Sequence, residues 1–301
     1  MLDQGVNSKS FVLSVLFSLF ILCFYIVKYS FFTNDFFVVC DVGQGDGLYF
    51  RVNNNDIIID SGSGRDMLYC LGKYMPFWDK KIELALLTHP QKDHYGGFLF
   101  ILDEYNIDRF ILPSVYNSKA ESYKQFLSKL YSKAVIKKEV LFSGDYINIG
   151  DSAVLLLFWP SKGFVNENIV KSNALAFDNK YFYDTSLDLN LFSYTGLFYT
   201  TKGDKRVLLT GDINKEILVS LLKQYNSLVQ QVDYLKQPHH GSKTGFDDKI
   251  FNLAKIDNVL ISVGTSNPYD HPSDDLIDYL NLNKINFLRT DIQGNIVINL
   301  N

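Results

Sequence analysis

"THPQKDHYGG" (residues 88–97) directly follows an apolar run, residues 82–87, that predicts a buried strand. The chain has five histidines, and two of them, His89 and His94, lie in this loop with Asp93 directly before the second. Because the loop begins where the strand ends, it is expected at the carboxyl edge of a sheet, where ligand sites of α/β proteins form. Imidazole and carboxylate side chains together are typical ligands of zinc and manganese.

The other histidines and two further aspartates occupy the same kind of position. Asp60 ends "IIID", Asp212 ends "RVLLTGD", His239 and His240 follow "VDYLKQP", and His271 comes after "NVLISVG". Loops at the carboxyl ends of strands bring distant residues together, so we expect these side chains to converge. Five unrelated surface histidines are the alternative, and the neighbouring carboxylates make that reading the weaker one.

This donor set predicts two divalent ions, zinc or manganese, that share a carboxylate. Asp93 and His94 are adjacent and reach one ion, His89 reaches the neighbouring one, and Asp212 is the natural bridge. Asp60 is expected behind them, as an acceptor that fixes the tautomer of a histidine. The candidate metal ligands are His89, Asp93, His94, Asp212, His239, His240 and His271.

Composition limits the partners and the compartment. The chain has 301 residues, 47% of them hydrophobic, which is enough for one large domain or two small ones. A net charge of −4 gives no general attraction to nucleic acid, so a polyanionic substrate needs a local positive centre such as a metal. The three cysteines are widely spaced without a C-x-x-C pair, and we expect buried, inert thiols without a disulfide framework or thiolate metal site.

The N-terminus predicts a membrane anchor. Residues 11–27, "FVLSVLFSLFILCFYIV", carry no charge and are bracketed by Lys9 and Lys28. We expect a tail over residues 1–9 and one uncleaved transmembrane helix over residues 10–32. A cleaved signal peptide is the alternative, but bulky "KYSFFTNDFF" follows where small residues are usual. One lysine on each side leaves the orientation open.

The rest of the chain, residues 33–301, predicts a single α/β domain, because strand-like and helix-like segments alternate without a linker or repeat. Residues 118–133 place apolar side chains on one helical face. Apolar runs predict strands at residues 36–41, 48–52, 57–60, 82–88, 109–112, 153–159, 197–201, 206–211, 232–236, 258–264 and 295–300.

Several ordered motifs resemble a known family. "HPQKDH" resembles the H-x-H-x-D-H motif of the metallo-β-lactamase fold. "DVGQGDG" (41–47), "IDSGSG", "LTHPQKDHYGG", "LLTGDI", "HHGSKTG" and "NPYDHPS" together resemble the metallo-β-lactamase-like domain of the ComEC family, membrane proteins of bacterial DNA uptake. The segment "NLFS" (190–193) is also similar to that family. Over residues 36–301, the resemblance implies an αββα sandwich with a two-metal cleft at one edge and a hydrolytic, phosphodiesterase activity.

Two departures from the family pattern bear on function. Gln91 stands where the general motif has its second histidine, and no histidine lies between His94 and His239. We therefore expect one ion site to be weaker, to be completed by His239 or His240, or to prefer manganese. The chain has one anchor and no multi-span channel region, so a separate DNA-uptake channel protein is an expected partner.

Two loops keep alternative interpretations. "DVGQGDG" is either a tight turn that glycines permit, or a loop that brings Gln44 or Asp46 beside the metals. In "HHGSKTG", either Ser242 and Lys243 hold a phosphate, or Lys243 faces solvent. The side chains expected to support the ligands are Asp60, Gln91, Gln44, Asp46 and Ser242.

These observations and the resemblance predict a membrane-anchored nuclease or phosphodiesterase that acts on DNA, single strands above all, through hydroxide that the metals generate. The expected catalytic residues are Asp93, His94, Asp212, His240 and Lys243. A hydrolase of a lactone, an amide or a cell-envelope phosphoester is the first alternative, and a catalytically silent binding module is the second. By analogy, the protein is expected in the bacterial cell membrane, with the catalytic domain outside the cytoplasm.

Overall fold

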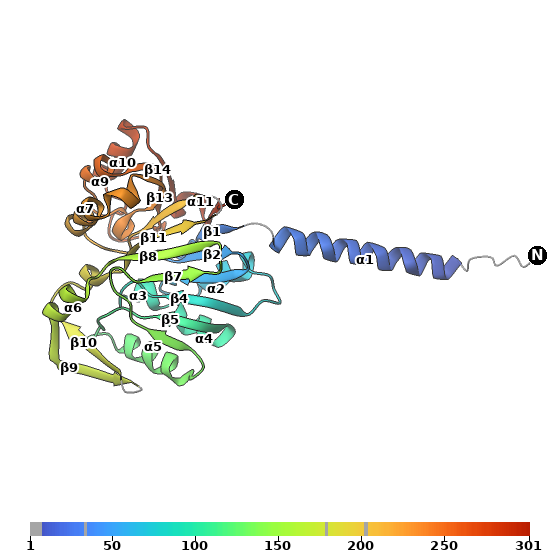
Figure 1. The fold of residues 1–301 in the computed structure, drawn as a ribbon, viewed down its shortest axis with the longest axis horizontal. Helices are drawn as coiled ribbons and strands as arrows, with labels where there is room; N and C mark the ends of the chain where they lie inside the picture. The colour runs from blue at the N-terminus through green and yellow to red at the C-terminus, as the bar shows by residue number, and fades with distance from the viewer. Residues whose placement is uncertain (1–7, 33–34, 178–179, 202–203) are drawn as a thin grey trace, which may run out of the picture.

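The computed structural model describes residues 8–32, 35–177, 180–201 and 204–301. Helix α1 (Ser8–Phe32) extends away from the remaining elements, which pack together (Figure 1). Of the described helices, α1 is the one that is long and apolar enough to cross a membrane, and none of its span Ser8–Tyr25 is buried. The predicted position of the apolar helix is thus confirmed.

The first sheet contains seven strands in the order β16-β1-β2-β3-β4-β5-β6. They are β16 (Ile296–Asn299), β1 (Phe36–Val39), β2 (Leu48–Val52), β3 (Asn55–Ile59), β4 (Lys81–Leu86), β5 (Asn106–Ile111) and β6 (Lys137–Glu139). Strands β3 to β6 are parallel, and the others pair antiparallel. Asn53 and Asn54, with φ of 48° and 60°, form the tight turn between β2 and β3, which asparagine tolerates.

The second sheet also contains seven strands, in the order β15-β14-β13-β12-β11-β8-β7. They are β15 (Asn286–Arg289), β14 (Lys255–Ile261), β13 (Gln231–Lys236), β12 (Arg206–Leu209), β11 (Thr195–Thr200), β8 (Ala153–Trp159) and β7 (Tyr146–Ile149). Strands β12 to β15 are parallel to one another. A separate hairpin pairs β9 (Ile169–Phe177) with β10 (Lys180–Thr185).

Helices cover the outer face of each sheet. The helices are α2 (Asp66–Tyr74), α3 (Lys92–Tyr95), α4 (Phe98–Glu104), α5 (Glu121–Ser132), α6 (Lys162–Asn168), α7 (Lys215–Gln224), α8 (Asn226–Val229), α9 (Lys249–Leu253), α10 (Asp274–Leu282) and α11 (Thr290–Gln293), with 3-10 turns η1 (Leu189–Phe192) and η2 (Pro238–Gly241). Helix α5 lies within the predicted helix at residues 118–133, so that prediction is confirmed.

Three hydrophobic cores show the order of the layers. In β1, Phe37 and Val39 point into the core between the two sheets, whereas Val38 points into the core that α2, α4 and α5 cover. This alternation is the two-residue period of a strand buried on both faces. A third core joins the second sheet to α7, α9 and α10. The predicted αββα sandwich is confirmed.

The cysteine prediction was wrong. Cys40, directly after β1, forms a disulfide with Cys70 of α2, and their Cα atoms lie 6.0 Å apart. The two positions are 30 residues apart and meet because α2 packs on β1, a contact that no local spacing could indicate. The third cysteine, Cys23, is exposed on α1 and not buried.

The two sheets place functional loops at one common edge. The carboxyl ends of the parallel strands β3 and β4 lie there in the first sheet, and those of β12 and β13 lie there in the second. The loop that follows β1 reaches the same edge, because β1 runs in the same direction as β3. All the predicted ligand loops therefore start from this edge.

Candidate metal centre

His89 lies in the loop that follows β4. Asp93 and His94 lie in α3, the short helix that comes after this loop. Asp60, at the end of β3, accepts hydrogen bonds from the Thr88 amide and the Thr88 hydroxyl, both at 2.7 Å. The Nδ1 atom of His94 lies 2.8 Å from the same carboxylate. The backbone of Asp60 is left-handed, with φ of 58°. This conformation is uncommon for residues other than glycine and often marks a functional site. Asp60 therefore ties two strand-end loops together.

The second sheet contributes Asp212, directly beyond β12, and the histidine pair of η2. His239 and His240 have φ of 47° and 55°, so both are in the left-handed region. The amide of Asp212 donates to the Ser193 hydroxyl at 3.0 Å. The Nδ1 atom of His240 lies 3.0 Å from the carbonyl oxygen of Ser262, which can only accept, so Nδ1 carries the proton.

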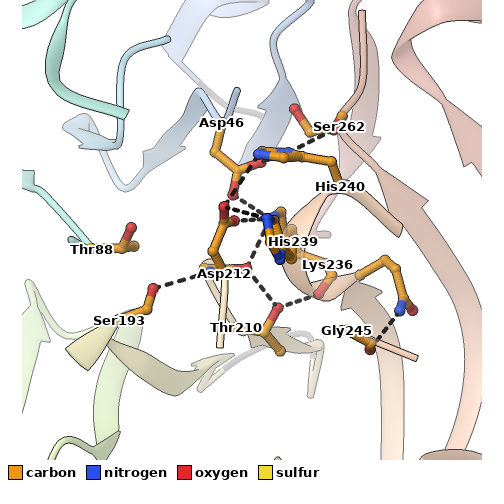
Figure 2. A network of polar contacts seen from close by, with 12 residues as sticks. Asp46, Thr88, Ser193, Thr210, Asp212, Lys236, His239, His240, Gly245 and Ser262 are labelled. Atoms are coloured by element: carbon orange, nitrogen blue, oxygen red, sulfur yellow. Dashed lines mark hydrogen bonds and ion pairs between the residues drawn. The ribbon is translucent and has the colours of Figure 1, made fainter. Parts of the chain in front are cut away.

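The histidines of both sheets converge on one atom, Oδ2 of Asp212. The Nε2 atoms of His94 and His240 are each 3.3 Å away from it. Those of His89 and His239 are 3.9 and 4.0 Å away, respectively. Figure 2 shows Asp212, Asp46 and His240 pointing toward one another from different strand ends. Residues from distant parts of the chain therefore form a single cluster.

The cluster fits divalent metal ions because several of its buried polar atoms have no hydrogen-bond partner. These atoms include Nε2 of His89, His94 and His240 and both carboxylate oxygens of Asp212. Buried polar atoms are normally satisfied, so this concentration indicates ligands for an ion. Ligand atoms lie within 4.8 Å of one another in four groups: His89, His94 and Asp212; Asp93, His94 and His240; Asp46, Asp212 and His240; and Asp46, Asp60 and His94.

Solved structures with the same fold identify the architecture. The structure is similar to the metallo-β-lactamase fold protein YhfI from Bacillus subtilis, with a TM-score of 0.53 and 13% identity over 88% of this chain and 100% of that chain. The chain has the metallo-β-lactamase fold. At this identity the comparison shows the fold alone.

Curated sequences give a narrower likeness within the metallo-β-lactamase fold. The chain is 24% identical over 274 residues to ComE operon protein 3 of Bacillus subtilis, covering 85% of this chain and 32% of that protein. It is 24% identical over 303 residues to Recombination protein 2 of Haemophilus influenzae, covering 97% and 32%, respectively. The chain thus spans about a third of the length of these relatives. No family model matches it. The likeness fits a ComEC-like metallo-β-lactamase domain, as the motifs predicted.

Burial and neighbouring charges set the protonation of the cluster. Burial, together with the neighbouring His94, lowers the pKa of His89 to about 3. Burial alone would raise the pKa of Asp93, but His94 and His240 outweigh it and lower that pKa to about 2. Burial would lower the pKa of His94, but Asp212 and Asp60 raise it well above the usual value. Without an ion, the site therefore carries its own positive charge on imidazole.

Sequence reasoning missed Lys236, the last residue of β13. It is buried with 1% of its side chain exposed, forms an ion pair with Asp46, and lies 3.7 Å from Oδ1 of Asp212. It also donates to the Gly211 carbonyl at 3.1 Å. The ammonium is thus a permanent positive charge behind the cluster. Its place in a strand-like run gave no sign of this role.

The "DVGQGDG" loop reaches the histidine and aspartate cluster, which was one of its two predicted interpretations. Gly45 has φ of 128°, and a Cβ atom there would overlap the carbonyl oxygen of Asp93. Asp46 contacts the cluster directly, with Oδ1 at 3.3 Å from Nδ1 of His240. The Oε1 atom of Gln44 is also buried without a hydrogen-bond partner.

The remaining candidates lie around the cluster. Gln91 donates from Nε2 to Oδ1 of Asn190 at 2.7 Å, so the two amides bind each other. The Ser242 hydroxyl is 2.8 Å from that of Thr244 and supports the loop itself. Lys243 is 77% exposed, with Nζ at 3.7 Å from Asp275.

His271 lies at the rim and is in none of the four groups of described residues. Its ring centroid is 5.7 Å from that of His239 and 5.8 Å from that of Tyr269, which stacks at 26° and is 63% exposed. A cleft of about 530 Å³ reaches from Asp93 and His240 to these three rings. A second cleft of about 990 Å³ shares the rings and continues toward Arg289.

Proposed function

We propose that this chain is a membrane-anchored, metal-dependent phosphodiesterase that cleaves DNA, with a preference for single strands. The observation that carries the proposal is the convergence of unpartnered imidazole nitrogens on the buried Asp212 carboxylate. Mixed imidazole and carboxylate donors suit zinc or manganese. The likeness to ComEC-like domains supports DNA as the substrate.

The cluster offers ligands for two ions. Asp93, His94 and His240 would hold one, and His89, His94 and Asp212 form a second group that could hold the other. When bound, such ions lower the pKa of water and offset the charge that grows on a phosphate. Gln91, which stands where the general motif has a histidine, is paired with Asn190, and an amide oxygen would favour manganese over zinc for the second ion.

The protein's own groups orient the ligands. Asp60 accepts the Nδ1 proton of His94, and the Ser262 carbonyl accepts that of His240, so the Nε2 atom of each ring faces Asp212, where an ion would displace its proton. Lys236 helps to keep Asp46 ionised against burial, and His240 and His94 do the same for Asp212. His271, outside the ligand groups, lines the same cleft as Asp93 and His240.

The rim favours an unpaired base. Tyr269 presents an exposed ring that stacks on His271 beside the cleft containing Asp93 and His240. Bases of a single strand stack on such rings without sequence preference, whereas bases within a duplex are already stacked. The two connected clefts give a polymer room to extend toward Arg289 and Lys243.

The anchor and the disulfide support a catalytic domain outside the cytoplasm. Helix α1 has 25 residues and is about 37 Å long, which exceeds the roughly 30 Å hydrocarbon core of a bilayer. The Cys40–Cys70 disulfide fits an oxidising compartment, because cytosolic thiols are kept reduced. A C-terminal alkaline phosphatase fusion is expected to be active, and activity of a cytoplasmic reporter instead would reverse the orientation.

The test of function uses the full chain purified in detergent. End-labelled single-stranded DNA, duplex DNA and RNA, and bis-p-nitrophenyl phosphate, are each incubated with zinc, manganese or chelator. We expect manganese-dependent cleavage, fastest on single-stranded DNA, that is lost in Asp93→Ala. The matched control is Asp103→Ala, a surface carboxylate that pairs with Lys129 and should retain activity.

Other outcomes separate the alternatives. Turnover of the small phosphodiester without cleavage of nucleic acid would contradict the DNA assignment and leave a hydrolase of another phosphoester. Cleavage that persists equally in Asp93→Ala would show a contaminating nuclease. Metal binding without any turnover would favour a binding module.

A further inference from the structure

The loop between α2 and β4, residues 75–80, carries two large aromatic side chains at the surface. Phe77 is 83% exposed and Trp78 is 46% exposed. Their ring centroids are 4.7 Å apart in an edge-to-face arrangement. Met75, at the base of the loop, is buried in the core beneath α2 and holds the loop in place. Exposed apolar groups that gather at one point usually mark an interaction surface.

The register of the first sheet places this loop at the edge where β1 begins. Phe36 of β1 pairs with Arg51 near the end of β2, and Asn55 at the start of β3 pairs with the end of β2. Strands β3 and β4 are parallel, so β4 also begins at this edge, at Lys81. The metal centre lies at the opposite edge, beyond the carboxyl ends of β3 and β4.

The chain holds this edge close to α1. Helix α1 ends at Phe32 and β1 begins at Phe36, so the connection spans at most about 14 Å when fully extended. Strand β4 is three strands away from β1, roughly 14 Å at the usual spacing. Figure 1 shows α1 leaving the domain beside β1. If α1 crosses a bilayer, the loop is within reach of that bilayer's surface.

The chemistry of the loop matches the headgroup region of a lipid bilayer. Tryptophan and other aromatic rings concentrate at this depth because they combine an apolar body with a polar or polarisable edge. Lys73 and Lys80 are exposed on the two sides of the loop. Lysines at this position attract anionic lipid headgroups. At the same edge, Val135 before β6 is 92% exposed.

We propose that residues 75–80 dock into the lipid interface of the bilayer that α1 crosses, with Phe77 and Trp78 inserted among the headgroups. This inference rests on the proposed membrane anchor. The domain then has two attachments to the bilayer, and its rotation about the short linker is restricted. The metal centre faces away from the membrane, toward a substrate that approaches from the aqueous side.

The test uses the fluorescence of the chain's two tryptophans, Trp78 and Trp159. The full chain is reconstituted in vesicles of phosphatidylcholine and phosphatidylglycerol, with or without lipids brominated near the headgroup end of the acyl chains, which quench nearby tryptophan. The Trp159→Phe variant reports Trp78. We expect its emission to be blue-shifted relative to that of a tryptophan in water, and the brominated lipids to reduce its intensity about twofold. The matched control Trp78→Phe reports Trp159, whose Nε1 donates to the Leu191 carbonyl at 2.7 Å, and its emission should not change.

Flotation of the same vesicles separates the two hypotheses. Protein that floats with unquenched Trp78 would retain the anchor and overturn docking of the loop. A blue shift without quenching would mean that protein, such as a second copy, covers the loop, which also overturns the proposal. Protein that does not float with the vesicles would contradict both the membrane anchor and the docking of the loop. Phe77→Asp in the Trp159→Phe background should float normally and lose most of the quenching.

Discussion

Replacing Lys236 with methionine should destabilise the metal-free protein strongly. The ammonium is 1% exposed and forms an ion pair with Asp46, which is also 1% exposed. Removing one partner of a buried ion pair leaves an uncompensated charge and costs about 3–5 kcal/mol. At ~2–4 °C per kcal/mol for a domain of this size, the melting temperature should fall by roughly 6–20 °C.

Adding manganese should recover part of the lost stability. In the variant, Asp46 and Asp212 have lost the positive charge of Lys236, and a bound cation would replace it. Thermal unfolding with chelator and with manganese measures both effects. Lys205→Met is the matched control, since Lys205 is 34% exposed, pairs with Asp233, and should cost at most about 1 kcal/mol. Equal melting temperatures for the two variants in chelator, or an equal gain from manganese, would refute the role of Lys236.

Three further predictions concern other parts of the fold. Reducing the disulfide, or replacing Cys40 and Cys70 by serine, should cost ~3–4 kcal/mol in urea unfolding for a 30-residue loop, whereas Cys23→Ser should leave stability unchanged. Gly45→Ala should weaken manganese binding in calorimetry, because its Cβ displaces the Asp93 carbonyl; unchanged affinity would contradict that contact. The pKa of His94 is raised in the metal-free chain, so an ion must displace its proton. Manganese affinity should therefore increase about tenfold per pH unit between pH 6 and 7 for each displaced proton. An affinity that does not change with pH would contradict this.

The sequence could predict the loops of the cluster because each loop begins where a clear strand signal ends. Asp60, His94 and Asp212 come from separate apolar runs, and the carboxyl ends of parallel strands meet at one edge. Among the described residues, the strands that were not predicted are β6, β7, β9, β10 and β15. They include short edge strands such as "KKE" at 137–139, which have no apolar run to reveal them.

Contacts between distant residues could not be predicted from local pattern. Lys236 ends an ordinary strand-like run, and its ion pair depends on Asp46 arriving from the other sheet. The Cys40–Cys70 disulfide likewise depends on how α2 packs across β1. Gln91 could be recognised as a departure from the motif, but its amide partner, 99 residues further along the chain, could not.

The capture of divalent cations by the Asp212 cluster can be tested most directly by anomalous diffraction from crystals of the full chain grown with manganese. The account predicts anomalous density between the Nε2 atoms of His94 and His240 and the Asp212 carboxylate, and its loss in Asp212→Asn crystals. Well-ordered crystals that hold manganese elsewhere, with no anomalous density at this cluster, would contradict it.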